Sequence, residues 1–286
     1  MYSGLIVFSK HSGAFLGAHQ KIDRVARKHL QRLGISEHDF PKTRDILHFE
    51  GVNGPDGVKR KSPGKNEPWH YVDPFNEDDT QLGEMLDDHY NQLTAALQSH
   101  DMVRAAFEAA WLAHALVDGL TPAHHYPYEQ ELSKLRGGAG LETRTNFKKK
   151  LIMPGETKRE KVSNNWKMWG AGGLFTTHAS FEMGVATLIK PLTFKDTAPS
   201  PTELENVKAI GVRELFSRAA REIAVLDMYH NYRKKGWTPK LAWQVRHRLG
   251  PVLIQTVALA WYAALDEAGL IEKNSNIKHQ TPKFEV

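Results

Sequence analysis

The 286-residue sequence predicts an all-α fold, a single-domain bundle of several helices. Apolar residues recur at helical spacing through most of the chain. No segment shows the alternation of β-branched residues that is typical of hairpins. Hydrophobic residues make up 41% and charged residues 25% of the sequence, as in ordinary globular proteins. A chain of this length can bury a substantial core as one domain.

Seven helices are expected in order along the chain. Asp101 is a typical N-cap for the third helix. Thr202 has Glu205 three residues further on, which is the spacing of a capping box at the start of the sixth. Pro251 is expected to kink or interrupt the seventh, because proline lacks the amide donor of a helix interior. The expected ranges are 19–33, 80–99, 102–119, 141–152, 174–190, 202–235 and 240–267.

Segments rich in Gly, Pro or Lys separate these helices, at 51–68, 136–140 and 191–201. The domain is expected to span residues 1–272, and the polar segment 273–286 is expected to be a tail. The start of the chain lacks the basic region, long apolar stretch and cleavage site of a signal peptide, so a cytoplasmic location is expected. The longest apolar run is too short to be a transmembrane segment.

Composition limits the chemistry of any metal site. The chain has no cysteine, so imidazole and carboxylate groups would have to hold a metal. The net charge of +5 suits an anionic partner, and the basic residues cluster at 148–150, 158–161 and 233–235. Solvated helix faces explain most clusters of this kind. The fifteen histidines are more informative, since their positions can be tested against helical geometry.

Four predicted helices each place a histidine on a face that is otherwise apolar. In two of them a carboxylate follows at the fourth residue and therefore shares that face. A buried carboxylate must be paired or bound to a metal, because its desolvation alone costs several kcal/mol. A single histidine on an apolar face, however, is ordinarily a hydrogen-bonded core residue. The residues concerned are His19, His89, His114 with Asp118, and His178 with Glu182.

Residues 114–124 carry the motif His-x-x-x-Asp-x-x-x-Pro-x-His, formed by His114, Asp118, Pro122 and His124. This motif resembles the signature of the zinc-dependent phospholipase C family, to which the fungal single-strand nucleases are related. Further parts of the family's pattern follow in order along residues 1–190. They are His19 on the first helix, Asp73 in the segment HYVDP, His89 on the next helix, and the final pair His178 and Glu182.

The resemblance implies a helical bundle of the phospholipase C and nuclease type that holds two or three zinc ions. It assigns Asp73, His89, His114 and Asp118 to one zinc. It assigns His124, His178 and Glu182 to the second, and His19 with Asp118 to the third. The activity it implies is hydrolysis of a phosphate ester by a metal-bound hydroxide, with Asp73 as candidate general base. A phospholipid is the substrate best known for the family, and peripheral membrane contact is therefore expected.

The chain departs from the family pattern in two places. The family completes its third zinc site with an N-terminal tryptophan, but this chain has Ile6 at the corresponding place. His11 could substitute, or the cluster could hold two ions. Residues 125–177 form a longer connection than in compact relatives, either an insertion packed outside or a cap that carries Trp166 and Trp169 over the site.

Duplicate histidines leave some assignments open to test. His124 is preferred to His125 because it lies two residues after Pro122, and His70 is interpreted as a neighbour of the site rather than a ligand.

Three alternative functions remain. The same fold could act on single-stranded nucleic acid or a nucleotide. The dipeptides His38-Asp39 and His100-Asp101 could indicate another class of helical phosphohydrolase. The chain could also be a catalytically inactive metal-binding relative.

Overall fold

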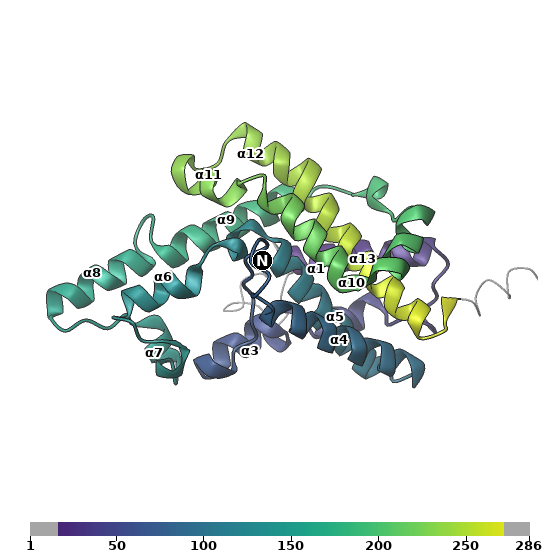
Figure 1. The fold of residues 1–286 in the computed structure, drawn as a ribbon, viewed down its shortest axis with the longest axis horizontal. Helices are drawn as coiled ribbons and strands as arrows, with labels where there is room; N and C mark the ends of the chain where they lie inside the picture. The colour runs from purple at the N-terminus through teal and green to yellow at the C-terminus, as the bar shows by residue number, and fades with distance from the viewer. Residues whose placement is uncertain (1–16, 272–286) are drawn as a thin grey trace, which may run out of the picture.

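The structure is a computed structural model that describes residues 17–271, apart from the side chains of residues 52, 60 and 61. Every regular element in this range is a helix, which confirms the all-α prediction. The expected tail at 273–286 lies outside the described residues. Figure 1 shows a bundle of long helices from which the segment around α6, α7 and α8 extends to one side.

The central helix is α5 (Met102–Leu120). From Ala105 onward its side chains are buried except for Phe107 and Trp111. Its many alanines let neighbouring helices approach closely, and it packs against α1, α4, α10 and α13. The indole Nε1 of Trp261 on α13 donates a hydrogen bond to the Ala109 carbonyl at 3.0 Å. These four neighbours are α1 (Ala18–Arg32), α4 (Gln81–Gln98), α10 (Pro201–Ala224) and α13 (Gly250–Glu267).

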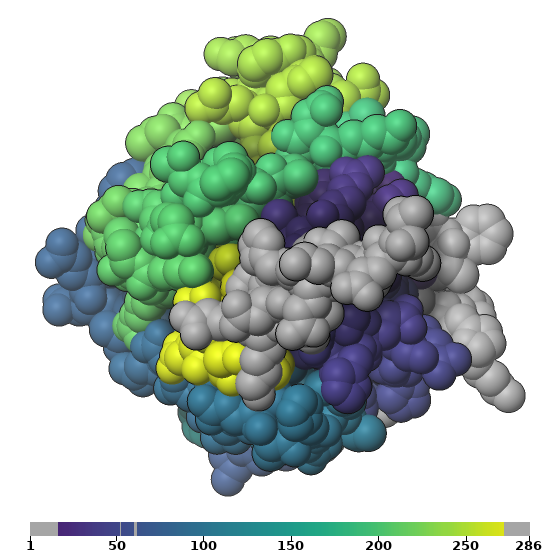
Figure 2. All heavy atoms as spheres, turned by 90° about the vertical axis from the view of Figure 1, so that its right-hand side faces the viewer, coloured from purple at the N-terminus to yellow at the C-terminus, as the bar shows by residue number. Residues whose placement is uncertain are grey.

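Shorter helices connect and cover this core. Figure 2 shows the end of the molecule opposite the α6–α8 segment, where early, middle and late parts of the chain meet on one surface. This agrees with the packing of α13 on both α1 and α4. The remaining α-helices are α2 (Thr43–His48), α3 (Pro55–Lys61), α6 (Tyr128–Leu135), α7 (Phe147–Leu151), α8 (Lys158–Trp169), α9 (Leu174–Ile189), α11 (Met228–Lys235) and α12 (Pro239–Gln244).

Several predicted boundaries are corrected by the structure. The expected loop 51–68 contains α3, and the expected helix 141–152 is reduced to the five residues of α7. The expected helix 202–235 breaks at Asp227, whose φ of 50° ends α10 and starts α11. Its capping box is formed by Ser200 and Glu203 instead of Thr202 and Glu205.

Two other local predictions are confirmed. The Asp101 side chain accepts a hydrogen bond from the amide of Arg104, as an N-cap does. The helix that contains Pro251 is interrupted by a π-helical turn at Val245–Leu249, which ends two residues before the proline. The stretch Pro239–Glu267 is long and apolar enough to cross a membrane by length and composition, but most of it is buried as the core helix of this bundle.

The segment 125–177 forms an arm with a small apolar core of its own. We call α6, α7, α8 and their connections the arm. Its core is distinct from the main one and is filled by side chains of Tyr71, Tyr128, Leu132, Met153 and Met168. Because Tyr71 and Tyr128 also lie beside metal-ligand candidates, this small core joins the arm to the site.

Candidate metal centre

Asp118, on the last turn of α5, lies among four imidazoles. The Nδ1 atom of His70 is 2.6 Å from its Oδ2, and the Nε2 atom of His114 is 3.3 Å from the same oxygen. On the other side, Nε2 of His19 is 3.2 Å and Nε2 of His124 is 3.8 Å from Oδ1. All five side chains are buried. One buried carboxylate thus contacts imidazoles from α1, from α5, from the 3-10 helix Pro122–His125 and from the segment between α3 and α4.

Glu182 forms a second buried group with His124 and His178. Its Oε1 atom lies 2.8 Å from Nε2 of His124 and 2.9 Å from Nε2 of His178. His178 and Glu182 share a face because they are four residues apart on α9. Burial by itself raises the pKa of Glu182, whereas His178 and the hydrogen bonds from both imidazoles lower it, and the net direction is well below its ordinary value. Glu182 is therefore a carboxylate at neutral pH.

A third group joins Asp56 and His70 to His114. The three residues can each offer an atom within 4.8 Å of the other two, and Oδ1 of Asp56 is 3.8 Å from Nε2 of His114. Asp56 lies in the first turn of α3, directly after Pro55. That turn is held close to the preceding segment, because a Cβ at Gly54 would come within 2.6 Å of the Phe49 carbonyl oxygen. Asp56 is the most exposed of the candidate ligands, with a side chain that is 24% accessible.

Hydrogen bonds to the other ring nitrogens orient two of these histidines. The Nδ1 atom of His124 donates to the backbone carbonyl of His70 at 2.7 Å. The Nδ1 atom of His114 lies 3.3 Å from Oε2 of the buried Glu50. With the proton held on Nδ1, the lone pair of each Nε2 points toward Asp118 and Glu182. Such outer partners fix the tautomer of metal-binding histidines.

Burial also sets the charge of the imidazoles. Desolvation, followed by nearby cationic groups such as Lys59, lowers the pKa of His70 well below its ordinary value. Desolvation likewise lowers the pKa of His124, in spite of its hydrogen bond with Glu182. Both side chains are therefore neutral at pH 7. Neutral imidazole is the form that binds a divalent cation.

The spacing of these atoms fits metal ions with nitrogen and oxygen ligands. Two atoms bound to one zinc ion at tetrahedral angles lie about 3.3 Å apart. Asp118 lies at 3.2 Å from His19 and at 3.3 Å from His114, close to that value, whereas the separations of 2.8 and 2.9 Å between Glu182 and its two histidines are those of hydrogen bonds. The buried groups can therefore hold metal ions. They are His19, His114 and Asp118; Asp56, His70 and His114; and His124, His178 and Glu182.

The structure brings together six of the eight ligands predicted from the sequence and places Asp73 and His89 elsewhere. The Nδ1 atom of His89 bonds to Glu108 at 2.6 Å, because α4 runs antiparallel to α5 and meets it well before His114. Asp73 is exposed, and its Oδ1 accepts the backbone amide of Phe75. Neither residue belongs to any of the three groups.

Two further residues, His70 and Asp56, lie with His114 in a group that could hold a metal ion. From the sequence, His70 is interpreted as a neighbour of the site, and Asp56 falls in the expected loop 51–68. Pro55 at the first helical position followed by an acidic residue is typical of a helix N-terminus and could have identified α3. The surrounding Gly, Pro and Lys residues hid that pattern.

Other histidines are accounted for by local contacts. The Nε2 atom of His125 bonds to the Gly119 carbonyl at 2.8 Å, and burial lowers its pKa to about 4, so the preference for His124 is supported. In the two His-Asp dipeptides, Asp101 caps α5 and Asp39 accepts hydrogen bonds from Ser36. The positions of Ile6 and His11 lie outside the described residues.

The three groups are linked through shared ligands. His114 belongs to two of them, and Asp118 contacts His124 of the third. The arrangement is therefore one continuous centre at the C-terminal end of α5.

Comparison of the chain with protein-family models, with curated proteins and with solved structures finds no match in any of the three.

Proposed function

We propose that this chain is a zinc-dependent hydrolase of phosphate esters, of the phospholipase C type. The observation that carries the proposal is the position of Asp118, whose two oxygens face imidazoles of three ligand groups. A carboxylate shared between neighbouring cations is the arrangement expected of a multinuclear hydrolytic centre. The resemblance of the motif at 114–124 to the phospholipase C signature supports the same function.

In this proposal the ligands would be divided among three ions. The first would be held by Asp56, His70, His114 and Asp118, and the second by His124, His178 and Glu182. The third would be held by His19 and Asp118. When bound, zinc would supply Lewis-acid chemistry, because it acidifies water and offsets negative charge on a phosphate ester.

The protein's own groups would divide the remaining work. Glu50 and the His70 carbonyl hold the rings of His114 and His124 in place, so the centre is preorganised. Asp118 and Glu182 are buried and engaged by imidazoles. Asp56 is the carboxylate of the centre that solvent reaches most easily. We therefore propose Asp56, in place of Asp73, as the general base that accepts a proton from water.

Metal analysis combined with turnover of a soluble chromogenic phosphodiester tests the proposal. Purified protein should contain two or three zinc ions per chain, and Asp118→Asn should lower both zinc content and turnover, the latter by at least about a hundredfold. Asp73→Asn is the matched control and should change neither. Zinc-free protein, or full turnover in Asp118→Asn, would refute the proposal. Bound zinc without turnover on this diester, on a phosphocholine ester or on a single-stranded oligonucleotide would indicate an inactive metal-binding protein.

A further inference from the structure

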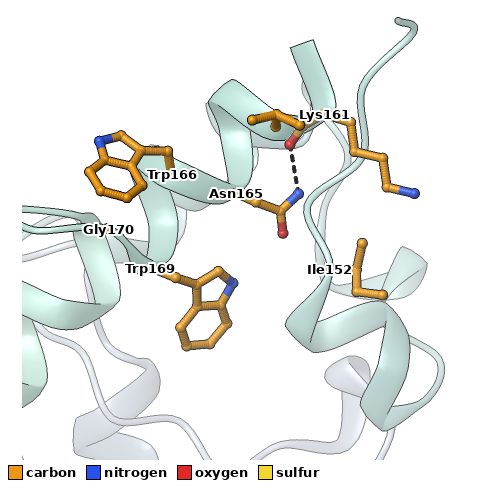
Figure 3. Close-up of a pocket in the computed structure, with 7 residues that line it drawn as sticks. Ile152, Lys161, Asn165, Trp166, Trp169 and Gly170 are labelled. Carbon is orange, nitrogen blue, oxygen red and sulfur yellow. Dashed lines mark hydrogen bonds between the residues drawn. The ribbon is translucent and has the colours of Figure 1, made fainter. Parts of the chain in front are cut away.

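The arm presents an apolar surface to solvent. On α8, Val162 is 71% exposed and Trp166, one turn further along, is 66% exposed. Phe147 at the start of α7 is 53% exposed. Between α8 and the end of α7 lies an open hollow of about 570 Å³ lined by Ile152, Trp166 and Trp169 (Figure 3). Clustered exposure of this kind marks an interaction surface, since single exposed apolar residues are usually scattered.

The arm is held together by hydrogen bonds that do not involve the exposed side chains. The Asn165 side chain binds both the amide and the carbonyl of Met153, at 3.1 and 2.9 Å. The indole Nε1 of Trp169 donates to the Leu151 carbonyl at 2.7 Å. Met153 and Met168 are buried beneath these contacts. Val162 and Trp166 take no part in these hydrogen bonds and remain largely exposed.

The positive charge of the chain is concentrated on the same segment. Residues 147–169 contain seven basic and two acidic residues, a net charge of +5. The rest of the chain has 31 basic and 31 acidic residues, so this segment accounts for the whole net charge. Lys150 alone of the seven pairs with a carboxylate of the described residues, that of Glu67. The seven are Lys148, Lys149, Lys150, Lys158, Arg159, Lys161 and Lys167.

We propose that the arm docks on the surface of a bilayer that contains anionic phospholipids. Tryptophan prefers the boundary between lipid headgroups and acyl chains, and lysines attract the negative lipid surface around it. An exposed Trp and Val stripe on a short basic helix supplies both contributions. The two observations are independent, because one concerns exposed apolar area and the other concerns charge.

The docking surface continues toward the metal centre. Trp169 contacts Phe175 at the start of α9, with ring centroids 4.7 Å apart, and Phe175 is also exposed. His178 follows Phe175 by three residues on the same side of α9. A membrane held by the arm would thus lie beside the helix that supplies two metal ligands. Docking itself does not depend on the proposed function, whereas delivery of a lipid headgroup to the centre rests on it.

Partition of the full chain onto vesicles tests docking. The protein should bind vesicles of phosphatidylcholine with phosphatidylserine at least about tenfold more tightly than phosphatidylcholine alone, since each surface cation contributes about fivefold. The double variant Lys148→Glu/Lys149→Glu should lose at least about tenfold, and so should Val162→Ser/Trp166→Ala. Two matched controls on exposed surfaces elsewhere, Lys234→Glu/Lys235→Glu and Trp243→Ala, should retain binding.

Turnover of the soluble phosphodiester separates this inference from the proposed function. Both arm variants should hydrolyse it at the wild-type rate, which also shows that they fold. No preference for anionic vesicles, or equal losses in the control variants, would overturn docking. If the arm variants instead lose binding to a single-stranded oligonucleotide and not to vesicles, the surface binds nucleic acid. If wild-type protein hydrolyses no diester, the proposed function fails while vesicle partition still decides docking.

Discussion

The Nδ1 atom of His70 lies 2.6 Å from Oδ2 of Asp118, although 48 residues separate the two in the chain. His70 lies in the segment between α3 and α4, and its backbone carbonyl also accepts the Nδ1 proton of His124. His70 thus contributes its ring to the group with Asp56 and His114, and its carbonyl orients the ring of His124 in another group. This double contact makes His70 a structural centre of the site.

Substitution of His70 should remove metal, whereas substitution of His89 should not. His70→Gln is expected to lower the metal content by about one ion per chain and to weaken metal affinity at least tenfold. In His89→Gln the new side-chain amide can still donate to Glu108. Because this pair lies outside the three groups, the variant should retain the full metal content. Elemental analysis of both purified variants gives the comparison. Retained metal in His70→Gln together with lost metal in His89→Gln would return His89 to the ligand set.

Removal of metal should destabilise the fold. Binding at about a thousand times the dissociation constant contributes about 4 kcal/mol to stability. For a domain of this size that corresponds to a decrease of roughly 8–16 °C in Tm on chelation. Differential scanning calorimetry with and without EDTA measures the change, and added zinc should restore the original Tm. A Tm that is indifferent to chelation would argue against bound metal.

His29 should make stability depend on pH, at a position remote from the centre. Its Nε2 atom pairs with the Thr197 hydroxyl at 3.0 Å, and burial, followed by Arg32, lowers its pKa below the ordinary value of 6.5. The unfolded chain therefore binds a proton more readily than the folded chain as the pH falls through 6.5. The free energy of unfolding should decrease from pH 7 toward pH 5, and His29→Gln should reduce that decrease. Urea unfolding of both proteins at the two pH values measures it, and equal slopes would contradict the prediction.

Gly119→Ala should destabilise the end of α5 that carries Asp118. A Cβ there would lie 2.5 Å from Cδ2 of Leu82 and 2.7 Å from the Phe216 ring. Helix propensity alone favours alanine by about 1 kcal/mol. The steric overlap should outweigh this and leave a net loss of about 1–3 kcal/mol in the free energy of unfolding, measured by urea titration. A stabilised variant would show that Leu82 and Phe216 move aside.

Helix periodicity was enough to predict the ligand pairs that lie on one helix. His114 with Asp118 and His178 with Glu182 share a face because they are four residues apart, and no tertiary contact is needed to establish that. The N-cap at Asp101 and the interruption near Pro251 are equally local. The sequence therefore determined the helical class and most of the long helices, and together with the family resemblance it predicted six members of the candidate metal centre.

Tertiary structure brings Asp56 and His70, and not Asp73 or His89, into the groups that could hold a metal ion. Each of these residues stands in a plausible sequence context, and His89 does point inward, but toward Glu108. Which side chains meet depends on which residue of α4 lies opposite which residue of α5, and on where α3 contacts the core. Such interhelical register arises from packing of residues far apart in the chain, which the spacing within one helix does not encode.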